Sequence, residues 1–308
     1  MNYTLNQLNI FLKISKTLSV TKAAEELHLT QPAVSIQLKN FQNQFDIPLT
    51  EVIGRRIYIT DFGKQIAQTA ESIIEGVDEI KAKNLAFQGK LFGKLTISIV
   101  STGKYVMPYF LTRFMRMYPD VELEMNVTNK SSVLNDLEKN KVDFSLVSVV
   151  PDTINLEKFG LLANRLYLVV NPNNEVLEFK SPIDILSKMP LLYRELGSAT
   201  RVSMERYIKN NDISIAKKIE LTSNEAIKQA VIAGMGCSIM PLIGLKEEII
   251  NGVLKIYDLN GLPIETEWSL VWPSGKKHSP VVISYLQFLR DNKETIKNSH
   301  FSWYELNG

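Results

Sequence analysis

The sequence predicts an α+β protein with several domains: a small helical domain, one long helix and a larger two-lobed α/β domain. The chain has 308 residues, too many for one small core, so more than one domain is expected. Apolar residues follow a helical period in most of residues 1–90, after which near-continuous apolar runs alternate with helical patterns. We therefore expect domains at 1–62, 63–90 and 91–308.

Residues 1–62 begin with the pattern of two short helices. Apolar residues between Leu5 and Leu18 recur at the spacing of an amphipathic helix. A hydroxyl at Ser19 or Thr21 can cap a second helix, whose alanine pair at 23–24 lets another helix approach closely. Residues 28–30 then predict a tight turn into a third helix.

That third helix begins in the stretch "LTQPAVSIQLKNF", residues 29–41. Thr30 is a favourable N-cap residue, and Pro32 stands in the first turn, where its missing N–H costs nothing. A buried stripe follows at Val34, Leu38, Phe41 and Phe45. Helices joined by a three-residue turn, with a polar face on the last helix, predict a helix-turn-helix.

The outer face of the third helix carries an isoleucine at its centre. Ile36 lies beside Gln31 and Ser35, an unusual composition for a solvated face. In a DNA major groove, an apolar side chain can contact a thymine methyl, and a glutamine can pair with adenine. A surface for another protein is the alternative.

Residues 47–63, "IPLTEVIGRRIYITDFG", alternate in polarity and turn at Gly54, which predicts a two-stranded wing. Residues 1–66 hold seven Lys/Arg and five Asp/Glu, so the position of the cations matters more than the total charge. The predicted DNA-binding residues are Thr30, Gln31, Pro32, Ser35, Ile36, Lys39, Arg55 and Arg56.

From Asp61 a helical pattern continues for about 28 residues, or roughly 40 Å. Its apolar residues alternate steps of four and three, which indicates a heptad seam and a dimerisation helix. The predicted interface residues are Ile66, Ala70, Ile73, Val77 and Ile80, and the pattern continues at Asn84 and Phe87. The alternative is a helix that packs on the core of its own domain.

Residues 91–308 show the α/β pattern, which predicts buried parallel sheets in two lobes. We expect lobe one at 91–163 and 266–308, and lobe two at 164–265. The predicted helices span 103–117, 131–139, 182–187, 199–210, 223–233 and 279–296. The last dozen residues predict no element.

Ligands of open α/β sheets bind beyond the carboxyl ends of the strands, and helix N-termini favour anions. Several strand-to-helix junctions here carry hydroxyl, amide and basic groups, which predicts a small anionic metabolite between the lobes. The predicted effector-binding residues are Ser101, Thr102, Gly103, Lys104, Asn129, Lys130, Ser131, Ser148, Glu195, Thr200, Arg201 and Asn224. Arg194 could add positive charge, and Arg201 could instead pair with Glu195 or Glu205.

The sequence argues against several other classes of protein. The three histidines are scattered, and no nucleophile elbow, Walker-type loop or metal-ligand spacing appears, so we expect no enzyme and no cofactor. No apolar run approaches the roughly 20 residues of a membrane span, and the N-terminus lacks the features of a signal peptide. The single cysteine, Cys237, is expected to be a buried core thiol in a cytoplasmic protein.

Taken together, these segments resemble the LysR-type transcriptional regulators. The similarity covers nearly the whole chain, and "AAEELHLTQPAVS" at 23–35 is its most specific motif. "STGKYVMPYFLTRF", "RELGSATRVSMERY" and "SNEAIKQAVIAGMG" resemble the branch that regulates Calvin-cycle operons, the CbbR and RbcR group. Thr50 and Val52 depart from the Phe and Arg usual after the wing turn, and Lys130-Ser131 departs from the usual Arg-Glu.

The resemblance implies a winged helix-turn-helix that reads promoter DNA, a dimerisation helix, and an effector domain of the periplasmic-binding-protein type. It also implies a homodimer or a homotetramer built as a dimer of dimers, and contact with RNA polymerase as a hypothesis. The alternative is a cytoplasmic or exported small-molecule binding protein without promoter control.

Overall fold

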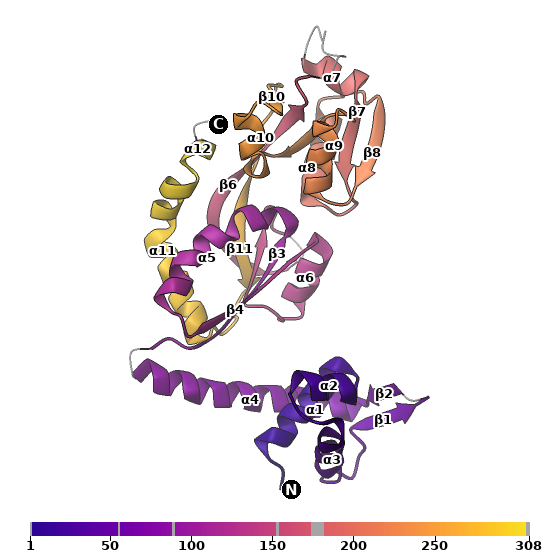
Figure 1. The fold of residues 1–308 in the computed structure, drawn as a ribbon, viewed down its shortest axis with the longest axis vertical. Helices are drawn as coiled ribbons and strands as arrows, with labels where there is room; N and C mark the ends of the chain where they lie inside the picture. The colour runs from indigo at the N-terminus through magenta and orange to yellow at the C-terminus, as the bar shows by residue number, and fades with distance from the viewer. Residues whose placement is uncertain (1, 55, 88–89, 152–153, 174–181, 306–308) are drawn as a thin grey trace. The chain divides into compact units, whose positions relative to one another are not determined.

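The structure is a computed structural model that describes residues 2–54, 56–87, 90–151, 154–173 and 182–305 (Figure 1). By its internal contacts the chain divides into two compact units, residues 1–90 and 91–308, which are described separately below. Across the described ranges, no helix is both long enough and apolar enough to cross a membrane.

Unit 1 confirms the predicted helix-turn-helix and wing. Its elements are α1 (Leu5–Thr17), α2 (Val20–Glu26), α3 (Gln31–Gln42), β1 (Thr50–Ile53), β2 (Arg56–Ile59) and α4 (Asp61–Phe87). Ser19 and Thr30 cap α2 and α3, accepting bonds from the N–H groups of Lys22 and Ala33. The turn between these helices passes through His28 in the left-handed region, at φ 54°.

The position of α4 corrects part of the dimerisation prediction. Ala70 is 1% exposed and lies in the core that Leu8 and Phe11 of α1 build, with Ile66 packed against the same core. Ala70 therefore cannot contact a second chain, because its side chain is already buried inside its own unit. By contrast, Ile73 and Ile80 are 39% and 68% exposed.

Val77 is half-buried on the same helix. The α4 side chains at Asn84 and Phe87 lie outside the described residues. Along the predicted seam, the residues that remain available to another chain are thus those after the first turns of α4.

Unit 2 is built on one mixed sheet and one small parallel sheet. The large sheet has the order β10–β6–β11–β5–β3–β4, with β9 also paired to β6, and the small sheet pairs β7 with β8. The strands are β3 (Gly93–Val100), β4 (Val121–Thr128), β5 (Phe144–Val147), β6 (Leu156–Val170), β7 (Pro190–Arg194), β8 (Lys217–Leu221), β9 (Ser238–Pro241), β10 (Lys255–Tyr257) and β11 (Ile264–Pro273).

Helices cover these sheets close to the predicted positions. They are η1 (Ser101–Tyr105), α5 (Met107–Met117), α6 (Lys130–Glu138), α7 (Pro182–Lys188), α8 (Ala199–Asn210), α9 (Asn224–Ile232), η2 (Leu242–Gly244), α10 (Lys246–Ile250), α11 (Pro280–His300) and α12 (Ser302–Glu305). Figure 1 shows α5 and α11 side by side, and Phe114 of α5 packs on Tyr285 of α11 with ring centroids 4.9 Å apart. On the other face, Val133 and Leu137 of α6 pack under β5 and β11.

The expectation of parallel sheets is only partly correct. β3 is parallel to β4 and β5, and β7 is parallel to β8, but β11 is antiparallel to both β5 and β6. The chain leaves through the 15-residue β6 and returns through the 10-residue β11, so these strands run in opposite directions. A continuous apolar run indicates that both faces of a strand are buried. It does not indicate whether the strand is parallel or antiparallel to its neighbours.

The last dozen residues, for which the sequence pattern was uninformative, contribute to two helices. α11 continues to His300 and α12 follows it, with Phe301 and Tyr304 only 2% and 0% exposed. The Tyr304 hydroxyl accepts a hydrogen bond from the N–H of Arg165 in β6 at 2.7 Å. The C-terminal residues therefore complete the core of unit 2.

Candidate functional site

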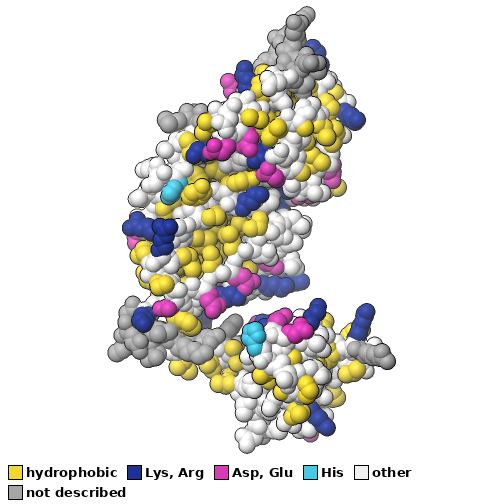
Figure 2. Space-filling model, viewed as in Figure 1, with side chains coloured by type: hydrophobic (Ala, Val, Ile, Leu, Met, Phe, Trp, Pro, Cys, Tyr) yellow, Lys and Arg dark blue, Asp and Glu magenta, His cyan; other side chains and the backbone are white. Residues whose placement is uncertain are grey.

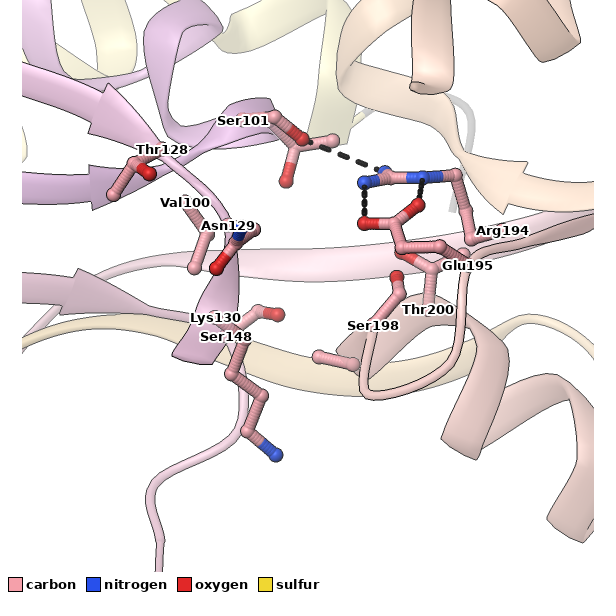
Figure 3. Close-up of a pocket in the computed structure, with 12 residues that line it drawn as sticks. Val100, Ser101, Thr128, Asn129, Lys130, Ser148, Arg194, Glu195, Ser198 and Thr200 are labelled. Atoms are coloured by element: carbon pink, nitrogen blue, oxygen red, sulfur yellow. Dashed lines mark hydrogen bonds and ion pairs between the residues drawn. The ribbon is translucent and has the colours of Figure 1, made fainter. Parts of the chain in front are cut away.

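A pocket of unit 2, named pocket 1 here, lies where β3, β4, β5 and β7 end. We use lobe one for the part around β3–β4–β5 and lobe two for the part around β7–β8. Pocket 1 is narrow, with a cavity volume of about 20 Å³. Its lining comprises Val100, Ser101, Thr102, Thr128, Asn129, Lys130, Ser148, Arg194, Glu195, Ser198, Ala199 and Thr200. Figure 3 shows Ser101 and Asn129 on one side, with Arg194, Glu195, Ser198 and Thr200 facing them.

The buried Arg194 guanidinium pairs with the neighbouring Glu195 and also reaches across pocket 1. Arg194, at the end of β7, is 5% exposed, and its guanidinium donates two hydrogen bonds of 2.7 Å to the carboxylate of Glu195. Nη1 of the same arginine donates to the Ser101 hydroxyl of lobe one at 3.4 Å. A charged side chain of lobe two thus contacts a hydroxyl of lobe one across the pocket (Figure 3).

Two helices begin at pocket 1, and their caps differ. Asn129 caps α6, because its side-chain oxygen accepts from the N–H of Ser132 at 2.9 Å. Ser198 stands at the N-cap of α8, yet its hydroxyl makes no capping hydrogen bond to that helix. The first N–H groups of a helix have no partner inside it, so the start of α8 can donate to a ligand.

Arg201 does not line pocket 1, which corrects its assignment as an effector-binding residue. Its guanidinium pairs with Glu205 at 2.9 Å and Glu220 at 2.6 Å, and donates to the carbonyl of Arg194 at 2.9 Å. The hydrogen bond that Arg201 donates to the Glu220 carboxylate is the main reason that the pKa of Arg201 is raised. Arg201 thus joins α8 to β7 and β8, and Glu205 is one of the two partners that the sequence suggested.

Other predicted residues also lie elsewhere. Gly103 packs on the core, where an added Cβ would stand 2.8 Å from a side-chain atom of Leu146, and Lys104 points to a different hollow. Ser131 is not among the lining residues, although its hydroxyl lies 4.0 Å from the Cβ position of Gly197 in lobe two. Asn224 lies behind the lining and donates to the Ser101 hydroxyl at 3.5 Å.

The sequence prediction missed Val100, Thr128, Ser198 and Ala199 as lining residues and treated Arg194 only as a source of charge. Ser198 stands directly before the predicted helix 199–210, and this N-cap position was the available signal. The predicted residues that do line pocket 1 are Ser101, Thr102, Asn129, Lys130, Ser148, Glu195 and Thr200.

In unit 1, the outer face of α3 has the composition that the sequence predicted. Ile36 is 57% exposed, and Lys39 is also exposed. Gln31 donates from Nε2 to the Ser35 hydroxyl at 3.1 Å, which orients the amide on this face. Arg56 is exposed on the wing, whereas Arg55 lies outside the described residues.

The described residues offer no site for a metal ion: no three His, Cys, Asp or Glu among them stand close enough together to hold one. Cys237 is fully buried, and burial raises the pKa of its thiol to about 12. A thiol with that pKa stays protonated near neutral pH and is a poor nucleophile.

Two family models match the chain. Residues 5–64 match the model described as "Bacterial regulatory helix-turn-helix protein, lysR family". Residues 88–294 match the model described as "LysR substrate binding domain". The matched ranges contain the helix-turn-helix and all residues of pocket 1.

Curated relatives extend over nearly the whole chain. The HTH-type transcriptional activator CmpR of Synechocystis sp. is 34% identical over 296 residues, covering 96% of this chain and 97% of its own. The RuBisCO operon transcriptional regulator of Acidithiobacillus ferrooxidans is 31% identical, covering 93% of each chain.

A solved structure is similar to unit 2. The regulatory domain of Synechocystis CcmR in complex with 2-PG has a TM-score of 0.61 and 30% identity, covering 66% of this chain and 98% of its own. With both family models, these relatives and this fold agreeing, the chain belongs to the LysR family of bacterial transcriptional regulators and resembles its CbbR-like branch.

Proposed function

We propose that this regulator senses a small phosphorylated carboxylate in pocket 1 and controls genes of CO2 fixation or carbon concentration. The observation that carries the proposal is the construction of pocket 1 from Arg194, the start of α8 and hydroxyls of lobe one. The CcmR regulatory domain, 30% identical to this chain, was solved with 2-PG, 2-phosphoglycolate. Relatives named as RuBisCO operon regulators support the choice of genes.

The groups around pocket 1 favour an anion with two charged ends. In lobe two, the start of α8, the Ser198 hydroxyl and the Arg194 guanidinium suit one phosphate or carboxylate. In lobe one, Thr102 and Asn129 offer donors to the other end. The Glu195 carboxylate accepts two hydrogen bonds from the Arg194 guanidinium. An anionic ligand would therefore share the guanidinium with Glu195 or displace that carboxylate from it.

Such a ligand would act as a switch because it joins the lobes. It shifts the protein toward one arrangement only if it binds that arrangement more tightly than the other.

We place lobe one at 91–163 and 266–308 and lobe two at 164–265, so that β6 and β11 cross between them. We further propose that the 1–62 domain reads a half-site, that helix 63–90 pairs the subunits, and that dimers or tetramers contact RNA polymerase at promoters in the cytoplasm.

The test is a titration of the full-length protein with 2-phosphoglycolate by calorimetry, beside a thermal-shift panel of sugar phosphates, phosphoenolpyruvate and inorganic phosphate. A ligand at 100 times its Kd stabilises the folded state by about 2.7 kcal/mol. We expect 2-phosphoglycolate or another phosphorylated carboxylate to bind, and the double variant Thr102→Ala/Ser198→Ala to weaken it at least tenfold. Ser302→Ala, in the exposed first turn of α12, is the matched control.

Two results would contradict this proposal. One is a flat panel from a protein that still binds DNA. The other is binding that the double variant leaves unchanged, which would locate the ligand away from pocket 1.

A further inference from the structure

Unit 2 has a second hollow, named pocket 2 here, which the effector proposal does not use. It lies between η1, the start of α5, α10 and the C-terminal α12, and has a cavity volume of about 480 Å³. It shares no lining residue with pocket 1. On the face of unit 2 that Figure 2 shows, hydrophobic side chains form a broad band with Lys and Arg side chains beside it.

Aromatic side chains form the walls of pocket 2. Tyr105, Tyr109 and Trp303 all line it, and Tyr109 is 45% exposed. The His300 ring packs on the Tyr109 ring with centroids 5.0 Å apart. Planar side chains set around one hollow suit a planar, partly apolar ligand.

Two lysines at pocket 2 rest on aromatic rings. Lys104 Nζ lies 5.0 Å from the centroid of Tyr105, and Lys246 Nζ lies 5.5 Å from the centroid of Trp303. Both lysines are exposed, and within the described part of the chain neither forms an ion pair with a carboxylate. Their charge is therefore available to an anion.

The third lysine of pocket 2 is different. Lys228 pairs with Glu225 at 3.2 Å and with Glu248 at 2.8 Å, so two carboxylates surround its single positive charge. Glu247, the other carboxylate that lines the hollow, is exposed. Among the described residues, the cations of pocket 2 that pair with no carboxylate are Lys104 of η1 and Lys246 of α10, with the exposed Glu247 beside them.

We propose that pocket 2 is a second ligand site, which takes a planar aromatic anion. The ring of such a ligand would pack on Tyr109 and Trp303, and its charged group would contact Lys104 and Lys246. A neutral aromatic compound would leave both lysines without an anionic partner. A small inorganic anion would leave the aromatic side chains of the walls exposed to water. Only the combined chemistry uses both features.

Pocket 2 shares a structural element with pocket 1. Ser101 and Thr102 of η1 line pocket 1, whereas Lys104 and Tyr105 of the same turn line pocket 2. The Tyr105 hydroxyl donates to Glu225 at 3.1 Å, next in the chain to Asn224, which contacts Ser101. A ligand of pocket 2 would therefore touch the turn that carries two pocket 1 residues.

The test uses 8-anilinonaphthalene-1-sulfonate as the planar anion and N-phenyl-1-naphthylamine as its neutral analogue, each titrated into the full-length protein. We expect the sulfonate to bind at least tenfold more tightly than the amine. The double variant Lys104→Ala/Lys246→Ala should lower sulfonate affinity at least tenfold. The matched control is Lys255→Ala/Lys293→Ala, because these lysines also rest on aromatic rings, those of Tyr257 and Phe159, but lie outside pocket 2.

Equal affinity for the sulfonate and the amine would overturn the proposal, since an apolar patch alone would explain it. So would equal losses in the two double variants, because the lysines would then act by general charge. Binding of 2-phosphoglycolate is measured separately and does not enter either outcome, so the two proposals can fail independently.

Discussion

At the scale of single residues, the helix-turn-helix shows why a local sequence can be so informative. The N-cap at Thr30, the buried Val34 and the exposed Ile36 all follow from the position of each residue on one regular helix. Arg201 shows the opposite case. Its partners are Glu205, four residues away on the same helix α8, and Glu220 on β8. The sequence suggested Glu205 but not Glu220, because Glu220 is distant along the chain.

The outer face of α3 leads to a prediction on DNA binding. Gln31→Ala should weaken binding to the specific site by about 1–3 kcal/mol and leave nonspecific binding nearly unchanged, because a glutamine pairs with a base edge. Lys39→Ala should weaken both kinds of binding and lower the salt dependence by about one ion, since it removes a phosphate contact. Titrations on operator and random DNA at two salt concentrations measure this, and equal losses for both variants would contradict the assigned roles.

His278 leads to a prediction on pH. Burial is the main cause that lowers the pKa of His278, and nearby Lys276 adds to it; its Nδ1 is buried with no hydrogen-bond partner among the described residues. The folded state therefore disfavours the protonated ring, so this contribution to stability is full above the unfolded pKa near 6.5 and is lost as the pH falls below it.

We expect the free energy of unfolding to fall between pH 7.5 and 5.5, and His278→Gln to make that fall smaller. One group changes the slope by at most about 1.4 kcal/mol per pH unit. Urea unfolding at both pH values measures it. An identical fall in the variant would show that other groups cause the acid sensitivity.

At the scale of elements, the presence of a helix or strand was easier to predict than the contacts that it makes with other elements. The predicted helices 131–139 and 199–210 appear as α6 and α8, because their apolar spacing and capping residues are local. The residues after 296 gave no regular pattern, yet they pack against α5 and β6. A short segment of apolar and aromatic residues does not reveal from its sequence whether it is buried, because that depends on the rest of the core.

The C-terminal segment gives a prediction on stability. Phe301 stacks on Phe110 with centroids 5.9 Å apart, and its ring edge meets Tyr109 at 5.2 Å. Phe301→Ala should lower the free energy of unfolding of unit 2 by about 3–5 kcal/mol, because it removes a buried ring and leaves a cavity. Chemical denaturation measures the change, with the exposed Ser302→Ala as control. A loss below about 1 kcal/mol would mean that the segment is not part of the core.

At the scale of the whole molecule, long strands and one long helix join the parts. β6 and β11 pair along ten consecutive β11 residues with one irregularity at Trp268/Ser269, so the large sheet passes through both lobes of unit 2. In unit 1, α4 begins on its own core and then presents Ile73 and Ile80 to solvent. Exposed apolar residues along a helix commonly mark an interface.

The exposed part of α4 gives a prediction on assembly. Ile73→Ser/Ile80→Ser should weaken self-association at least tenfold, because each isoleucine contributes about 1.5–3 kcal/mol when fully buried. Gln65→Ser/Gln68→Ser, at exposed polar positions of the same helix, should have little effect. Sedimentation over a range of concentrations measures the dissociation constant. Equal behaviour of the two variants would show that this face of α4 does not pair subunits.

The sequence alone determined the winged helix-turn-helix, the long helix, the order of the α/β elements and seven of the residues that line pocket 1. These features depend on periodicity, capping and strand-to-helix junctions, all of which are local along the chain. The tertiary structure alone decided that Arg194 crosses pocket 1, that Arg201 also pairs with Glu220, that Ala70 is buried and that β6 and β11 are antiparallel. Each of these depends on a partner distant in sequence, and charge pairing and burial are settled only when the chain brings such partners together.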